Sequence, residues 1–261
     1  MKLALFYIVI LLANIIQGIT GFAGTILAMP FSLKLVGMDI AVPVLNTLGL
    51  LSGIYVFAGN YRHVDKKELL RVAAVMIPTL LIGMWIRGRL AGSPRLLYVI
   101  LGILTVAIGI AGLVSTLGKK PAETGGKEPQ NTCGMPDPRK ASPARNAAQL
   151  ALLAAAGLVH GMFVCGGPLL IGYLTERIKD KTVFRATIST VWIFLNGIML
   201  ITQIAAGQWN AQLLKLQLIS VPFLLAGMFA GSLLYKRMSQ RVFMIITYIL
   251  LFIAGLTLFF K

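Results

Sequence analysis

Two short glycine-rich sequences interrupt long apolar stretches and hold most of the chain's chemically useful residues. A helix broken by glycine leaves backbone N–H groups without partners, and the N-terminus of the following helix adds partial positive charge. A break of this kind inside an apolar stretch is suited to binding an anion. The alternative is that the glycines only allow close helix packing. The candidate residues of the two sequences are Gly18, Thr20, Gly21 and Gly24, and His160, Gly161, Cys165, Gly166, Gly167 and Pro168.

His160 and Cys165 are the two reactive side chains of the second glycine-rich sequence. A histidine at membrane depth can donate to an oxyanion or carry a coupling proton, or it can be a satisfied structural residue. A cysteine there can contact a sulfur-containing substrate, although a buried cysteine commonly acts as a small apolar residue.

Uncharged polar residues inside the other apolar stretches can complete the hydrogen bonds of an anion. In membrane helices Ser and Thr also bond to their own backbone, so both interpretations stay open. Arg185 stands between the second glycine-rich sequence and the next apolar stretch and is a candidate for recruiting an anion, with snorkelling as the alternative. The polar candidates are Asn46, Thr187, Ser189 and Asn196.

No Asp or Glu lies inside an apolar stretch, which opposes a carboxylate proton relay and a cation cage. The sequence has no P-loop, no metal-ligand spacing and no nucleophile with a positioned base. We therefore expect neither an enzyme nor a bound cofactor or metal.

The composition places these residues in a membrane. Hydrophobic residues make up 57% of the chain and charged residues 12%, and the mean hydropathy is +0.85, which excludes a soluble globular protein. Apolar blocks recur at the length of about 20 residues that a membrane-spanning helix needs. The net charge of +16 lies mainly in connecting segments, so it indicates topology and contact with anionic lipid rather than with nucleic acid.

The apolar blocks form two similar sets of four. We infer a duplication with a first transmembrane repeat at 1–118, a flexible linker at 119–146 that holds five of the eleven prolines, and a second repeat at 147–261. The matching pairs are separated by 143 to 146 residues: Gln17-Gly18 with His160-Gly161, Gly24 with Gly167, Gly83 with Gly227, Arg95 with Arg241, and Gly109 with Gly255.

The first block of each repeat is either one spanning helix with an extension or a re-entrant hairpin with arms of about 11 to 15 residues. If all eight blocks cross the membrane, the Lys and Arg residues divide 13 to 11 between its two sides, whereas two hairpins divide them 17 to 7. The charge bias favours hairpins. The predicted fold is an all-α polytopic membrane protein of two inverted repeats, each with a hairpin-like segment and three transmembrane helices. The linker is then cytoplasmic and both termini are outside.

The sequence resembles the TauE/SafE family, also called the toluene sulfonate uptake permease family, over nearly its whole length. The resemblance is carried by 161–168 (GMFVCGGP), by 184–187 (FRAT) and by the weaker 18–24 (GITGFAG) with Pro30. Cys165 replaces a usual glycine, and Ala23 and Thr25 stand where the second repeat has Gly166 and Pro168. These departures bear on the identity of the substrate.

The resemblance implies a bacterial or archaeal inner-membrane permease that moves sulfite or an organosulfonate, often outward. Together with the candidate residues above, the resemblance predicts a secondary transporter. Its two glycine-rich breaks would form a central anion site with alternating access. The alternatives are a passive anion channel and a membrane-embedded enzyme acting on a lipid phosphate. Membrane lipid is the other expected partner.

Overall fold

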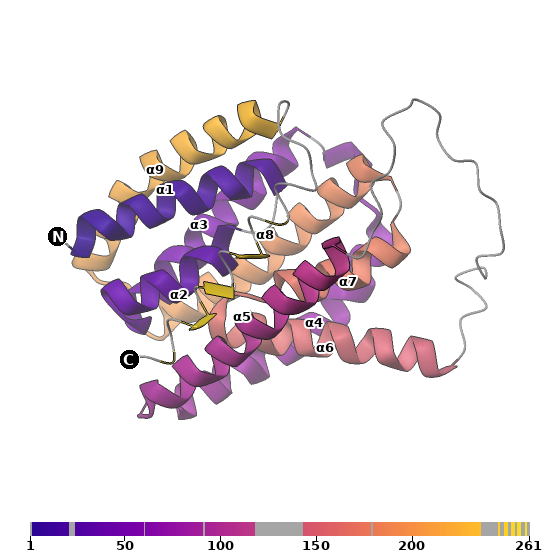
Figure 1. Ribbon diagram of the computed structural model, residues 1–261, viewed down its shortest axis with the longest axis horizontal. Helices are drawn as coiled ribbons and strands as arrows, with labels where there is room; N and C mark the ends of the chain where they lie inside the picture. Colours follow the sequence, from indigo (N-terminus) through magenta and orange to yellow (C-terminus); the bar gives the residue numbers. More distant parts are fainter. Residues whose placement is uncertain are drawn as a thin grey trace.

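The computed structural model describes residues 2–20, 24–59, 61–90, 92–117, 143–178 and 180–235, and several single positions between 245 and 259. Within the continuous ranges the chain is helical and contains no strand (Figure 1). Gly21, Cys133 and most of the linker lie outside this part. The helices are α1 (Lys2–Thr20), α2 (Gly24–Val36), α3 (Met38–Ala58), α4 (Lys66–Arg89), α5 (Pro94–Leu117), α6 (Pro143–Phe163), α7 (Gly167–Arg177), α8 (Lys181–Ala205) and α9 (Ala211–Tyr235), with a short 3₁₀ turn at Tyr61–His63.

Seven of these helices are long and apolar enough to cross a membrane: α1, α3, α4, α5, α6, α8 and α9. A helix rises 1.5 Å per residue, so α2 and α7, with 13 and 11 residues, extend about 20 and 16 Å and are too short to cross about 30 Å of hydrocarbon. The protein is therefore a multi-pass membrane protein, as predicted.

Local signals in the sequence set several helix ends. Asp65 begins α4 by accepting hydrogen bonds from the backbone N–H groups of Lys67 and Glu68, and Asp180 begins α8 in the same way. Gly37 separates α2 from α3 with a φ of 80°, a conformation that is inexpensive only for glycine.

The helices on either side of each glycine-rich break pack against each other, so the direction of the chain reverses between them. A β-carbon built on Gly24 would lie 2.8 Å from the carbonyl oxygen of Ala13, although a continuous helix would separate these residues by about 16 Å. A β-carbon on Gly166 would overlap the carbonyl oxygen of Ala156 in the same way. α2 thus folds back on α1, and α7 folds back on α6.

The arms of these hairpins are less equal than the sequence predicted. The first arms have 19 and 21 residues, longer than the expected 11 to 15, because Gly18 and Gly161 lie inside α1 and α6. Glycine is tolerated within a helix when it allows another backbone to approach. Each hairpin therefore combines one arm of spanning length with one short returning arm.

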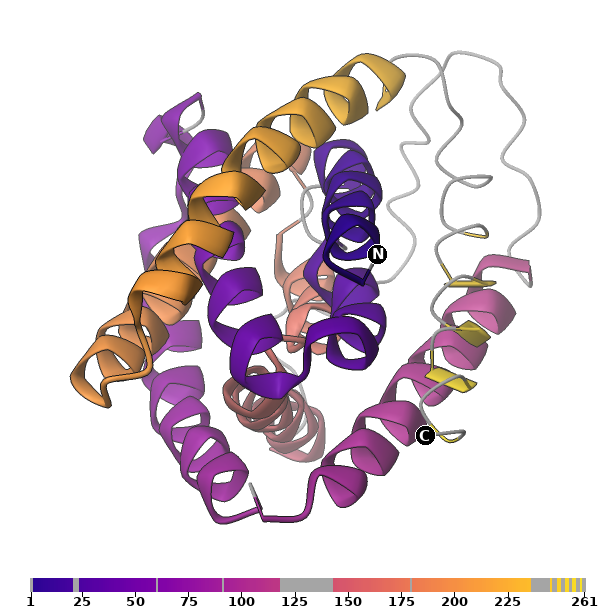
Figure 2. The same ribbon diagram turned by 90° about the vertical axis from the view of Figure 1, so that its left-hand side faces the viewer.

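The largest helix contacts join the two halves of the chain. α1 packs along α9, α6 packs along α4, and α3 crosses α8 (Figures 1 and 2). Under the proposed duplication α1 corresponds to α6, and α9 corresponds to α4. The contact of α1 with α9 is therefore the counterpart of the contact of α6 with α4. This pairing is what a duplicated chain leads us to expect; the duplication and its inversion stay predictions.

Glycines allow the two matching contacts to be close. A β-carbon on Gly18 would lie 2.7 Å from the carbonyl oxygen of Met228 in α9. One on Gly161 would overlap the carbonyl oxygen of Leu80 in α4. Gly227, for which the sequence favoured packing, meets α1 in the same manner. For Gly18 and Gly161, helix packing is the role that their surroundings support.

Candidate functional site

The tip of the first hairpin is held by the side chain of Gln17. Its amide oxygen accepts a hydrogen bond of 2.7 Å from the backbone N–H of Gly24, the first residue of α2. Its amide nitrogen donates to the hydroxyl of Ser52 in α3, at 3.1 Å. A buried glutamine thus satisfies one of the N–H groups that the break leaves open and ties the tip to α3.

The tip of the second hairpin has a strained backbone. Val164 has a φ of 58°, which is rare for a β-branched residue. α7 starts immediately afterwards, with Gly166 as its N-cap and Pro168 in its first turn, and proline there lacks only an N–H that would have had no helical partner. Such strain persists where the surrounding packing enforces it, and it is concentrated at functional sites.

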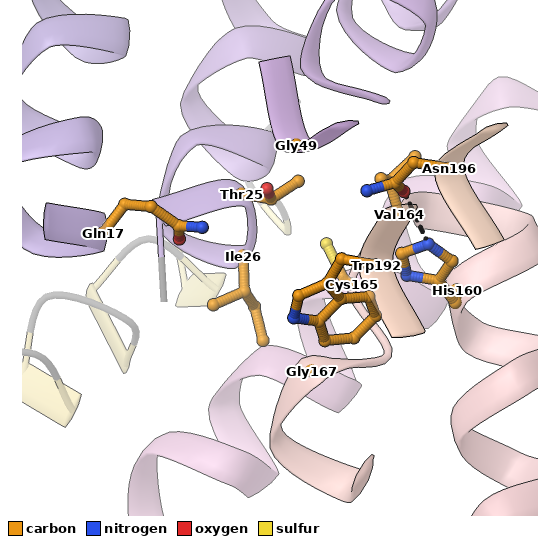
Figure 3. A pocket seen from close by; sticks show the side chains of 10 residues that line it. All are labelled: Gln17, Thr25, Ile26, Gly49, His160, Val164, Cys165, Gly167, Trp192 and Asn196. Carbon is orange, nitrogen blue, oxygen red and sulfur yellow. Dashed lines mark hydrogen bonds between the residues drawn. The ribbon is translucent and has the colours of Figure 1, made fainter. Parts of the chain in front are cut away.

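A small buried cavity lies between the two tips (Figure 3). Its volume is about 20 Å³, enough for about one water molecule. Among the described residues, histidine is the only acidic or basic side chain that lines it, and the other polar side chains are uncharged hydrogen-bonding groups. The lining residues are Gln17, Thr25, Ile26, Gly49, His160, Val164, Cys165, Gly167, Trp192 and Asn196.

His160 is the central polar residue of this cavity. It is 2% exposed, its Nε2 lies 2.9 Å from Oδ1 of Asn196, and its ring stacks on Trp192 with 5.0 Å between centroids. Its Nδ1 is buried and has no hydrogen-bond partner in the described part of the chain. With the Asn196 oxygen facing the ring, Nε2 carries the proton, and Nδ1 presents a lone pair that a bound molecule can satisfy.

Asn196 connects this site to the crossing of α3 and α8. Its backbone oxygen accepts a 3.0 Å hydrogen bond from the side-chain nitrogen of Asn46. Gly49 lets α8 approach, since a β-carbon there would lie 2.9 Å from the Asn196 amide nitrogen. Asn46 is therefore a neighbour that holds α8 against α3, and it does not line the cavity.

Cys165 lines the cavity with its thiol turned toward the backbone. The sulfur donates to the carbonyl oxygen of Phe163 at 3.0 Å, and the residue is 1% exposed. A thiol held in this way fills space and satisfies a carbonyl at the hairpin tip. No group of three His, Cys, Asp or Glu residues that could hold a metal ion occurs in the part of the chain that the structure describes.

Several predicted site residues lie away from the cavity. Thr187 accepts a hydrogen bond from the backbone N–H of Asp65. Ser189 donates to the backbone of its own helix, which is the alternative to anion binding that the sequence left open for Ser and Thr. Arg185 does not line the cavity, although its buried Nε has no partner among the described residues. The side chain of Thr20 is outside the described part.

The sequence did not select several lining residues, yet the offset between the repeats carries a signal for most of them. Gln17 stands 143 residues before His160, and Gly49 stands 143 residues before Trp192. Both pairs line the cavity. Applying the offset to every candidate would therefore have found Gln17 from His160. The same offset relates Thr25 to Pro168 and Val164 to Gly21, which were both candidates. Ile26 carries no comparable signal.

Comparison with known proteins agrees with this architecture. The family model described as "Sulfite exporter TauE/SafE" matches residues 6–258. The chain belongs to this family. No match was found among curated proteins or among solved structures.

TauE/SafE proteins form a family of sulfite and sulfonate exporter permeases, and its members are membrane transporters rather than enzymes. The match covers both hairpins and both halves of the chain. The resemblance drawn from the glycine-rich motifs is thus confirmed. The substrate of this member and its mechanism are matters for proposal.

Proposed function

We propose that this TauE/SafE protein is a secondary transporter for a small sulfur-containing anion such as sulfite or an organosulfonate. The observation that carries the proposal is the convergence of both hairpin tips on one buried cavity with an unpartnered histidine nitrogen. Broken helices that meet inside a bundle are where transporters of this plan bind their substrates.

The lining groups suit a small oxyanion accompanied by a proton. A neutral His160 already donates through Nε2 to Asn196, so its Nδ1 binds an anion only when a proton lies between them. That proton arrives on the imidazole or on the anion itself, and both routes move one anion together with one proton. The amide of Gln17 and the hydroxyl of Thr25 supply further polar contacts from the opposite wall.

The cavity must enlarge before such an anion can enter. Its volume of about 20 Å³ holds about one water molecule, whereas sulfite has four heavy atoms. The close contacts of α1 with α9 and of α6 with α4 each form a block that includes parts of both repeats. We infer that these blocks rock against each other at the crossing of α3 and α8, and so open the cavity to alternate sides.

The distribution of charge supports an orientation. The end of the molecule at which α3 and α7 end and α4, α6 and α8 start carries eight of the fourteen described Lys and Arg residues. This excess favours a cytoplasmic location for this end and for the linker. Both termini are then outside an inner membrane. The sulfite dianion keeps a net negative charge when it moves with one proton, and a negative-inside potential then drives it outward. We therefore propose export of sulfite.

The test is flux of radiolabelled sulfite in proteoliposomes, measured as counterflow. We compare wild type with Gly167→Leu, which fills the cavity, and with Gly197→Leu as a matched control, because a β-carbon on Gly197 meets no atom within 4 Å. We expect saturable counterflow that sulfonates inhibit, that Gly167→Leu abolishes and that Gly197→Leu retains. Unsaturable flux without counterflow would show a channel, and absence of flux with sulfite and sulfonates would refute the substrate class.

A further inference from the structure

A second, larger cavity opens where α4, α6 and α7 meet, away from the central site. Its volume is about 330 Å³, room for an oxyanion group and part of an attached carbon skeleton. It shares no lining residue with the central cavity. The lining combines two arginines, three uncharged polar residues and one leucine: Arg71, Arg177, Asn146, Gln149, Tyr173 and Leu150.

Arg177 enters this cavity without a carboxylate partner in the described structure. Its Nε donates to Oε1 of Gln149 at 3.1 Å, a neutral acceptor, and its guanidinium lies 5.5 Å from the ring centroid of Tyr173. The amide nitrogen of Gln149 donates in turn to Glu176. The guanidinium is thus fixed in position while its positive charge is not directly neutralised, the arrangement that favours recognition of an oxyanion.

Arg71, the second arginine of this cavity, is also held near Tyr173. It pairs with Glu68, and the second oxygen of Glu68 accepts a 2.9 Å hydrogen bond from the Tyr173 hydroxyl. The Arg71 side chain is still 48% exposed, so its remaining donors can reach a ligand. Tyr173 therefore keeps the two guanidinium groups at one cavity. Leu150, 47% exposed, adds an apolar wall.

The repeat-related positions at the other end of the molecule keep the positive charges but replace Gln149, the acceptor that holds Arg177. Positions 143 or 144 residues away place Lys34 opposite Arg177 and Lys215 opposite Arg71, but Phe6 replaces Gln149. Phe6 is fully buried, and the adjacent Tyr7 stacks on Phe223 at 5.2 Å. Aromatic packing there takes the place of the Gln149 contact. The arrangement that holds Arg177 therefore does not follow from the repeated fold alone.

We propose that this cavity binds the oxyanion group of a phosphate, with Arg177 and Arg71 as its ligands. The phosphate is either the headgroup of an anionic lipid, whose glycerol and upper acyl carbons would lie on Leu150, or free inorganic phosphate. Both sources share the chemistry of a tetrahedral oxyanion between two guanidinium groups. The inference does not depend on which anion the central site transports.

The experiment uses the purified full-length protein in phosphatidylcholine nanodiscs and has two arms. In the first, inorganic phosphate is added and the shift in Tm is measured. In the second, phosphatidylglycerol is mixed into the nanodiscs, and the lipid retained after detergent extraction is counted by native mass spectrometry. The variants are Arg177→Gln, Arg71→Gln and the control Lys34→Gln, which removes the same charge at the repeat-related position of Arg177.

We expect one arm to show binding that is at least about tenfold weaker in Arg177→Gln and Arg71→Gln and unchanged in Lys34→Gln. A response to inorganic phosphate identifies the free anion, and selective retention of phosphatidylglycerol identifies the lipid. If an arginine variant fails to fold, Leu150→Trp fills the cavity from an exposed position and must weaken binding equally. Wild type and these variants behaving alike in both arms would overturn the proposal.

Discussion

The hydrogen bond between His160 and Asn196 can be tested by a double-mutant cycle. His160→Phe keeps the ring that stacks on Trp192 at 5.0 Å and removes both nitrogens. Asn196→Leu removes the amide and leaves the backbone oxygen that Asn46 binds. The double variant replaces both partners of the 2.9 Å contact by apolar groups of similar shape.

The magnitude follows from the burial of the pair, since both residues are 2% exposed. Each single variant leaves one buried polar group without its partner, which costs about 2 kcal/mol of unfolding free energy. Replacing both partners removes that penalty, so the double variant should lose only about 1 kcal/mol. The expected coupling energy between the two positions is therefore about 3 kcal/mol, at the upper end of the range for residues in contact.

The assay has a stability arm and a transport arm. Unfolding free energies come from SDS titration of the protein in mixed micelles, followed by circular dichroism, and transport comes from sulfite counterflow in proteoliposomes. The double variant should be nearly as stable as wild type and yet inactive, because Nδ1 of His160 is absent. The reasoning would be refuted if the changes in unfolding free energy of the two single variants added up to that of the double variant within about 0.5 kcal/mol. Wild-type counterflow by His160→Phe would also refute it.

Three further predictions concern the hairpins. Gly161→Ala should destabilise the protein by about 2 kcal/mol because the new methyl group overlaps the backbone of α4. The control Gly197→Ala faces open space and should stabilise the protein by about 0.5 kcal/mol. Equal shifts in Tm for the two variants would contradict the packing role of Gly161. Cys165, 1% exposed, should react with maleimide at least about tenfold more slowly in the folded protein than in the SDS-unfolded protein. The reaction is measured by mass shift in a variant without the other cysteine. Rapid labelling of the folded protein would show that the hairpin tip is open. Gln17→Leu should abolish sulfite counterflow because it removes the acceptor for the first N–H of α2. Ser52→Ala leaves that hydrogen bond of Gln17 intact and should retain most of the counterflow. Similar losses in the two variants would mean that the hydrogen bond between Gln17 and Ser52 matters more.

Much of this architecture was predictable because its signals are local. The lengths of the apolar blocks gave the spanning helices, and the glycines near 24 and 166 marked two breaks that the structure shows as chain reversals. His160 could be singled out because a histidine is rare in an apolar block. The spacing of 143 residues also connects it with Gln17, which lines the same cavity.

The tertiary structure decided what each glycine and polar residue does. Gly18 and Gly161 resemble the other glycines of their motifs, yet they pack against α9 and α4, segments that lie far away in sequence. In a membrane both the lipid-facing and the protein-facing sides of a helix are apolar, so periodicity does not reveal which side is buried. The sequence by itself determined where the helices and breaks occur. Only the rotation and pairing of distant helices determined that Trp192 faces His160, that Thr187 binds a loop and that two arginines share a cavity.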